Sequence, residues 1–242
     1  MEKLAIALFG YGRMGKEIEK IAIERGHKIA LIVDIDNAET ITKADLEKVD
    51  VAIDFSLPTS VYENVLKCFD TNVPVIAGTT GWNEKLPEAK RICKERNQAL
   101  FFASNFSIGV SIFSEINKKL AQLMSTLNGY DVTMQEIHHT KKLDQPSGTA
   151  ITLAEQVLER VGRKVKWVNE TSNDKADLFI ESVREGNVPG THTIRYSSAV
   201  DDIEIKHTAH NRQGLALGAV LASEWIVGKK GVFSMSDMLD LK

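Results

Sequence analysis

The sequence predicts an α/β protein in which a domain with a mostly parallel sheet is joined to a second, α+β domain with a mixed sheet. Three observations predict this class. Short apolar runs alternate with amphipathic segments through the first hundred residues, as strands connected by crossover helices do. A glycine-rich turn directly follows the first apolar run. Beyond residue 105, a long amphipathic segment and several strand-like segments replace this alternation.

The first domain begins with one complete strand-helix-strand unit. Residues 15–25 place Ile18, Ile21 and Ala22 on one helical face, and Gly26 follows where a helix-ending residue is expected. The segments on either side, residues 4–9 and 28–33, are apolar runs of strand length. Further strands are expected at residues 51–55, 73–77 and 99–103.

The change of pattern places a domain boundary near Phe106. Residues 110–127 and 149–160 predict helices, and strands are expected at residues 131–136, 165–168, 191–197 and 202–207. The strongly apolar last helix, residues 214–227, is expected to return to the first domain. We therefore predict one domain of residues 1–105 with 213–242, and another of residues 106–212. The apolar stripe of the long helix comprises Ile112, Ile116, Leu120, Leu123 and Leu127.

Composition excludes several classes of protein. With 30 Lys and Arg against 33 Asp and Glu, the net charge of −3 gives no overall attraction to nucleic acid or to an anionic membrane. No apolar stretch approaches the ~20 residues that span a bilayer, and the first apolar run is too short for a signal peptide. Cys68 and Cys93 support neither a disulfide framework nor a cysteine zinc site. We expect a cytoplasmic protein.

The glycine-rich turn at residues 10–15 reads G-Y-G-R-M-G, between a predicted strand and a predicted helix. This pattern lets the backbone approach a pyrophosphate and points the helix N-terminus at the phosphates. Asp34 ends the second strand, where an acid bonds a ribose 2′-hydroxyl and favours NAD(H) over NADP(H). Arg13 in the turn could approach a 2′-phosphate. The alternative is a turn that merely connects strand to helix.

Two further loops follow predicted strands of the same sheet, G-T-T-G at residues 78–81 and A-S-N-F at residues 103–106. Ligands of an open parallel sheet bind outside the carboxyl ends of its strands. Both loops are therefore expected to face the cofactor, although each taken alone is also explained as a simple turn.

The most informative segment is residues 136–149, E-I-H-H-T-K-K-L-D-Q-P-S-G-T. It places imidazole and ammonium groups directly before Ser147, which is a natural N-cap. The helix that Ser147 would cap leaves the amides near Gly148 free to bind a carboxylate. His138 and His139 are adjacent, so on a strand they would point to opposite faces. Adjacent histidines without a cysteine or carboxylate pattern argue against zinc, so we expect no metal. By itself, the block could also be a solvated basic loop.

Here the sequence resembles a known family. The run matches the signature E-x-H-H-x-x-K-x-D-x-P-S-G-T of the 4-hydroxy-tetrahydrodipicolinate reductases, formerly called dihydrodipicolinate reductases, of the bacterial diaminopimelate and lysine pathway. The resemblance includes the glycine turn, D-F-S at residues 54–56, G-T-T-G, N-F-S at residues 105–107 and G-V-F-S-M at residues 231–235. It therefore extends along essentially the whole chain.

The resemblance implies an oxidoreductase that uses NADH, NADPH or both to reduce a small dicarboxylate. It implies a Rossmann-type domain completed by C-terminal residues, and a central domain that binds substrate and forms a homotetramer. It makes His138 the catalytic histidine and Lys142 the proton donor, with His139, Ser147, Gly148 and Thr149 on the substrate's carboxylates. The implied cofactor contacts are Gly10, Tyr11, Gly12, Arg13, Met14, Asp34, Gly78, Thr79, Thr80, Ala103, Ser104, Asn105 and Phe106.

The sequence departs from better-known members at two positions. Thr140 stands where a basic residue is frequent, and Ile35 stands where some members have an arginine after the acid. The second departure leaves the balance between NADH and NADPH open. Two other hypotheses are a different Rossmann oxidoreductase of amino-acid metabolism and a dinucleotide-sensing protein without turnover. Neither has a reason to possess the H-H-x-x-K and P-S-G-T run.

Overall fold

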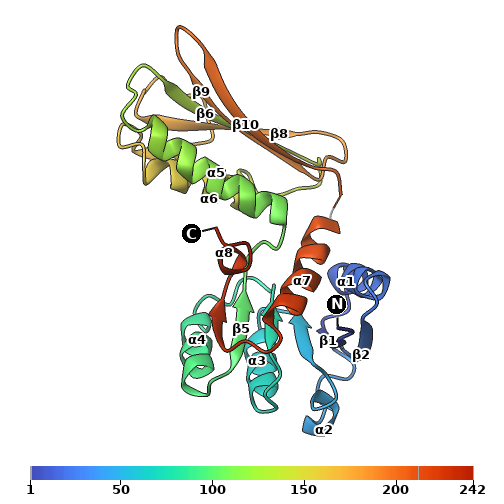
Figure 1. The fold of residues 1–242 in the computed structure, drawn as a ribbon. Helices are drawn as coiled ribbons and strands as arrows, with labels where there is room; N and C mark the ends of the chain where they lie inside the picture. Colours follow the sequence, from blue (N-terminus) through green and yellow to red (C-terminus); the bar gives the residue numbers. More distant parts are fainter. Residues whose placement is uncertain (1, 212, 242) are drawn as a thin grey trace. The chain divides into compact units, whose positions relative to one another are not determined.

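The computed structural model describes residues 2–211 and 213–241, which divide into two compact units (Figure 1). The first unit contains residues 2–108 and 213–241, and the second contains residues 109–211. The break follows Ile108, a few residues after the boundary drawn from the sequence. Phe106 is buried in the core of the first unit and Ile108 packs against that core, so both residues stay with the first unit.

The first unit is built on a parallel sheet, as the sequence predicted. Among the described residues, every strand pair of this sheet is parallel, and the strand order is β11-β5-β4-β3-β1-β2. The strands are β1 (Ala5–Phe9), β2 (Lys28–Val33), β3 (Val51–Asp54), β4 (Val75–Ala77), β5 (Ala99–Phe102) and β11 (Gly231–Phe233). β11 was not predicted; it pairs with β5 and completes the sheet with residues from the end of the chain.

Helices cover both faces of this sheet. Leu8 of β1 packs into a core with residues of α1 (Arg13–Glu24) and α7 (Gln213–Ile226), while its neighbours Ala7 and Phe9 pack with α3 (Val61–Phe69) and α4 (Leu86–Glu95). This alternation explains why the central strands are apolar throughout. α7 packs against α1, and Arg25 bonds Glu224 at 2.6 Å. The short helices are α2 (Lys43–Leu46) and α8 (Met235–Met238).

The second unit contains a mixed sheet with the strand order β10-β9-β6-β8-β7, which confirms the predicted class. β6 is parallel to β8 and antiparallel to β9. Helices α5 (Ile108–Met124) and α6 (Gly148–Leu158) lie on one face, where they form a single apolar core with the sheet (Figure 1). The strands are β6 (Asp131–His138), β7 (Lys166–Val168), β8 (Asp177–Arg184), β9 (Gly190–Ser197) and β10 (Asp202–Ala209).

The stripe predicted for the long helix does not form its core face. Ile112, Ile116 and Leu123 are 41%, 47% and 59% exposed. The buried face instead contains Phe113, Asn117, Ala121 and Met124. Asn117 is buried because its amide donates to the carbonyl of Leu153 and to Gln156 of α6. The helix carries two apolar arcs, and periodicity alone favoured the wrong one.

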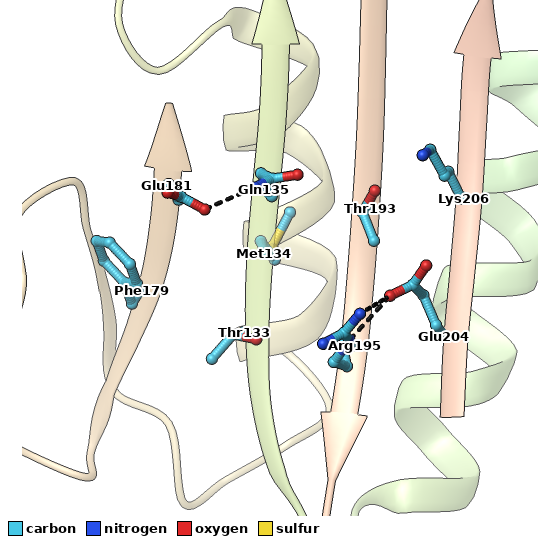
Figure 2. A pocket seen from close by; sticks show the side chains of 9 residues that line it. All are labelled: Thr133, Met134, Gln135, Phe179, Glu181, Thr193, Arg195, Glu204 and Lys206. Carbon is cyan, nitrogen blue, oxygen red and sulfur yellow. Dashed lines mark hydrogen bonds and ion pairs between the residues drawn. The ribbon is translucent and has the colours of Figure 1, made fainter. Parts of the chain in front are cut away.

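The other face of the second sheet is not covered by α5 or α6. It has a hollow of about 390 Å³ lined by side chains from β6, β8, β9 and β10 (Figure 2). Arg195 bonds Glu204 across two strands, and Gln135 bonds Glu181 across two others. Among the residues that the structure describes, no helix is long and apolar enough to cross a membrane.

Candidate functional site

The core-facing surface of the second sheet becomes polar at one end. Along β6, Val132 and Met134 point into the apolar core, so the alternation of the strand places Glu136 and His138 on the same face. β6 thus continues through His138, two residues beyond its predicted end. His138 is only 7% exposed, whereas His139, outside the strand, is partly exposed.

Glu136 lies at the centre of this polar end and is fully buried. Its Oε1 accepts hydrogen bonds from the backbone N–H of Ser147 at 3.0 Å, the hydroxyl of Ser182 at 2.8 Å and Arg184 at 3.0 Å. Its Oε2 lies 3.1 Å from Nδ1 of His138 and 3.9 Å from Nε2 of His192. Burial opposes ionisation of this carboxyl, but the hydrogen bonds from His138, Ser147, Ser182 and Arg184 outweigh it and hold its pKa well below the usual range.

Two imidazoles stand beside this carboxylate. The rings of His138 and His192 are 5.2 Å apart and nearly perpendicular. Burial, together with the nearby His138, lowers the pKa of His192 to about 4, and the charge of Lys142 is among the further causes. His192 is therefore neutral at neutral pH.

Glu136, His138 and His192 also form a possible metal-binding group, since their ligand atoms lie within 4.8 Å of one another. The histidine that joins His138 in this group is His192, from a distant part of the chain, and not its neighbour His139. The guanidinium of Arg184 already places a positive charge on Glu136, which disfavours a second cation there. The arrangement suits a hydrogen-bonded cluster better than a metal centre.

The loop after β6 carries the remaining residues of the basic block. The ammonium of Lys142 lies 2.8 Å from the carboxylate of Asp144, and this contact lowers the pKa of Asp144. Arg184 donates to the carbonyl of Asp144 at 2.7 Å, so it links the loop to Glu136. Lys142 is thereby held near the imidazole cluster.

The loop ends in the predicted N-cap. The hydroxyl of Ser147 accepts a bond from the backbone N–H of Ala150, and Gly148 opens α6. Gly148 is exposed, and a Cβ built on it would meet no protein atom within 4 Å. Thr149 is partly exposed beside it. The start of α6 therefore offers an open approach to its first amides.

Sequence reasoning missed three residues of this cluster, Ser182, Arg184 and His192. The first two lie on β8, which was not predicted although L-F-I at residues 178–180 is a short apolar run bounded by polar residues. His192 lies on a strand that was predicted, but the pairing that places it opposite Glu136 joins residues far apart in the sequence. A single sequence does not reveal that register.

The first unit contains a separate pocket of about 380 Å³ beside the glycine turn. Four of the residues predicted to contact the cofactor, Gly10, Tyr11, Gly12 and Asp34, line this pocket, and Ile35 lines it next to Asp34. Gly10 adopts a positive φ of 86°, and a Cβ there would stand 2.4 Å from the carbonyl oxygen of Phe55. Arg13 and Met14 are the first residues of α1.

A buried carboxylate also organises the loops near this pocket. Asp54, at the end of β3, accepts bonds from the hydroxyl of Ser56 at 2.8 Å, Asn64 at 2.8 Å and Thr79 at 2.7 Å. Ser56 and Asn64 line the pocket, and Thr79 belongs to the G-T-T-G loop. Asp54 therefore connects three segments around this pocket.

The other expected cofactor residues follow β4 and β5. Gly78 packs on the ring of Phe55, where a Cβ would come within 2.2 Å of the ring, and Thr80 is exposed. Ala103, Ser104 and Asn105 form the loop after β5. Phe106 is 1% exposed and stacks on Phe101, so the structure places it in the core and not in the pocket wall.

Comparison with known proteins identifies the family of both units. A model described as dihydrodipicolinate reductase, N-terminus, matches residues 4–106, and one described as dihydrodipicolinate reductase, C-terminus, matches residues 109–239. The 4-hydroxy-tetrahydrodipicolinate reductase of Christiangramia forsetii is 50% identical over 234 residues, 97% of each chain. That of Neisseria gonorrhoeae is 32% identical over 92% of this chain and 84% of its own length.

Solved structures show the same fold. A dipicolinate-bound dihydrodipicolinate reductase from Paenisporosarcina sp. TG-14 has a TM-score of 0.79 at 22% identity, over 96% of this chain and 98% of its own. A probable dehydrogenase from Thermotoga maritima has a TM-score of 0.57 at 13% identity, over 98% of this chain and 93% of its own. Because family models match both units and a relative is half identical along almost the whole chain, this protein belongs to the dihydrodipicolinate reductase family.

Proposed function

We propose that this protein reduces 4-hydroxy-tetrahydrodipicolinate to tetrahydrodipicolinate with NADH or NADPH, in the diaminopimelate route to lysine. The observation that carries the proposal is the gathering of the E-x-H-H-x-x-K and P-S-G-T residues around one buried carboxylate, in a chain that also has a glycine-turn pocket. Family membership and the half-identical reductase support the same activity. Free, buried cysteines suit a cytoplasmic enzyme.

The reaction replaces a hydroxyl by hydrogen, so one hydride and one proton enter and one water leaves. The nicotinamide cofactor, when bound, supplies the hydride. The protein must hold the dicarboxylate and deliver the proton from a positioned acid. We assign the proton transfer to Lys142, assisted by His138.

The substrate's carboxylates bind at the start of α6. Gly148 and Thr149 present backbone amides at a helix N-terminus, which favours an anion, and Ser147 caps this helix while its own N–H is bonded to Glu136. His139, which directly follows β6 and is partly exposed, is assigned as a further carboxylate contact. The dipicolinate in the Paenisporosarcina structure is a small dicarboxylate of the same kind.

We assign cofactor binding to the first unit, residues 2–108 and 213–241, and substrate binding to the second unit, residues 109–211. Gly10 to Met14 would hold the pyrophosphate and Asp34 the adenosine ribose, and Gly78 to Thr80 and Ala103 to Asn105 would form the remaining cofactor loops, whereas Phe106 belongs to the core. Asp34 and the apolar Ile35 line the pocket, and no Lys or Arg is among the described residues that line it with them. A 2′-phosphate would be repelled there, so we expect a higher kcat/KM with NADH than with NADPH.

The uncovered face of the second sheet is assigned to a homotetramer interface. It combines Phe179 with threonines and paired charges, a mixture suited to a self-complementary contact (Figure 2).

The activity is tested by mixing the protein with freshly prepared 4-hydroxy-tetrahydrodipicolinate and following the absorbance of NADH and, separately, NADPH. Substrate-dependent oxidation of a reduced cofactor is expected. Oxidation with other imines or semialdehydes but not with this substrate would indicate a different Rossmann oxidoreductase. Cofactor binding without any turnover would indicate a sensing protein.

A further inference from the structure

We propose that Glu136 is a positioning residue, which holds the catalytic imidazole and the carboxylate-binding turn in one rigid frame. The inference rests on the roles proposed above for His138 and for the turn at Ser147. Glu136 itself is fully buried, so it acts through these neighbours and not by touching the substrate.

One oxygen of Glu136 orients the imidazole. Oε2 lies 3.1 Å from Nδ1 of His138, and this contact fixes the ring and directs the opposite nitrogen, Nε2, away from the carboxylate. The space beside Nε2 is kept open by Gly190, because a Cβ there would stand 3.0 Å from that atom. Nε2 is therefore the ring atom available for proton transfer.

The other oxygen sets the turn. Oε1 accepts the backbone N–H of Ser147 at 3.0 Å, and Ser147 is the residue that caps α6. Ser182 and Arg184 on β8 donate to the same oxygen, so the carboxylate is tied to a strand as well as to the loop. Side chains fixed by packing and by hydrogen bonds on rigid elements are the usual support of a precise site.

Stability alone gives little reason for a carboxylate at this position. The same face of β6 carries Val132 and Met134, and an apolar residue at position 136 would continue that core without the desolvation cost of a buried charge. A carboxylate instead provides two acceptor oxygens, which connect two parts of the site that a single apolar side chain could not orient.

A double-mutant cycle of Glu136→Gln and His138→Gln tests the proposal. Glutamine keeps the shape and one acceptor but replaces Oε2 or Oε1 with a donor group. In Glu136→Gln we expect kcat about 10-fold to 100-fold lower, the scale on which orienting partners act, with NADH affinity unchanged. In the double variant, kcat should equal that of His138→Gln, because there is no longer an oriented imidazole to lose.

The outcomes are distinguishable. If the decrease in kcat of the double variant equals the product of the decreases in the two single variants, Glu136 acts independently of His138. This result would overturn the proposal and leave the proposed function intact. Near-normal turnover in His138→Gln would instead refute the role assigned to His138, and the positioning proposal with it.

Two further variants separate positioning from folding. Lys164 is also a buried charged residue of this unit, bonded to the carbonyls of Lys175 and Asp177 and to Asp131. Asp131 begins β6 and His138 ends it, roughly 23 Å apart along the strand, so Lys164→Met should lower the melting temperature but keep kcat. Ser182→Ala removes one bond to Oε1 without changing charge. It should lower kcat severalfold in the otherwise unchanged enzyme and not in the His138→Gln background, even if Glu136→Gln fails to fold.

Discussion

At the scale of single residues, Lys142 and Gly148 carry the most direct consequences. The ammonium of Lys142 is held at 2.8 Å by Asp144 in the free enzyme, ready to exchange this partner for a substrate. Gly148 leaves the first amides of α6 uncovered. In the proposed mechanism Lys142 supplies a proton and Gly148 leaves space for a carboxylate, so substitutions at the two positions should affect different kinetic parameters.

Lys142→Met should lower kcat by ~100-fold or more, the usual contribution of a positioned acid, because methionine fills similar volume without a proton to give. Steady-state kinetics and fluorescence titration with NADH would measure turnover and cofactor affinity, and the affinity should change little. Lys141→Met, an exposed neighbour in the same loop, is the matched control and should retain turnover. A nearly normal kcat in Lys142→Met would reject the assignment.

Gly148→Leu should raise the substrate KM by about 10-fold or more, which corresponds to the loss of one good anion contact of roughly 1.4 kcal/mol. No protein atom lies where its Cβ would go, so folding should be preserved and the effect should come from the substrate. Gly162→Leu, just beyond the other end of α6 and equally open, is the control. An unchanged KM would count against the carboxylate turn.

The buried His192 should make stability depend on pH. Its folded pKa, lowered to about 4 by burial, is below the unfolded value of 6.5, so the folded state resists protonation. The contribution to stability is full above pH 6.5 and is lost as the pH falls toward 4, by roughly 3 kcal/mol. Urea unfolding between pH 4 and 7 should give a flatter profile for His192→Gln. Parallel profiles for both proteins would contradict the assignment.

At the scale of secondary-structure elements, buried carboxylates at strand ends organise both units. Asp54 ends β3 and Glu136 lies near the end of β6, and each bonds groups from neighbouring segments. The regular backbone hydrogen bonds stop at the end of a strand. Side-chain acceptors there can bond the groups of the following loops and hold these loops in place.

Asp54→Asn should weaken cofactor binding by roughly 10-fold, because the new amide N–H₂ would face donors from Ser56, Asn64 and Thr79 and loosen the loops around the pocket. Titration with NADH would measure the dissociation constant. Asp70→Asn, at an exposed carboxylate that ends α3 in the same unit, is the control. Equal affinities for NADH in the two variants would remove Asp54 from this role.

At the scale of the whole molecule, the second sheet has one face covered by α5 and α6 and one face that these helices leave uncovered (Figure 2). Thr193 lies on the uncovered face between Arg195 and Lys206. If copies of the chain assemble through this face, a further cation there would meet like charges from the partner.

Thr193→Arg should therefore shift the protein from tetramer to smaller species, measured by light scattering after size-exclusion chromatography. Thr71→Arg places the same change at a similarly half-buried threonine of the first unit and should leave the assembly unchanged. A tetramer that persists in Thr193→Arg at low concentration would exclude this face as the interface.

The sequence by itself was sufficient for the features that depend on local patterns. Glycines spaced for a turn, the apolar runs of parallel strands and the N-cap at Ser147 follow from neighbouring residues, and the family signature is one continuous run. The parallel sheet and the mixed sheet were both predicted in this way, and both are present.

Only the tertiary structure decided which distant residues meet. Which apolar face of α5 is buried depends on the hydrogen bond from the amide of Asn117 to α6. The site depends on strand pairings that bring Ser182, Arg184 and His192 to Glu136. Such partners are separated by tens of residues, and no local periodicity records the register between strands. The sequence thus pointed to the residues that we propose to carry out the chemistry, while the fold determined which buried carboxylate they meet.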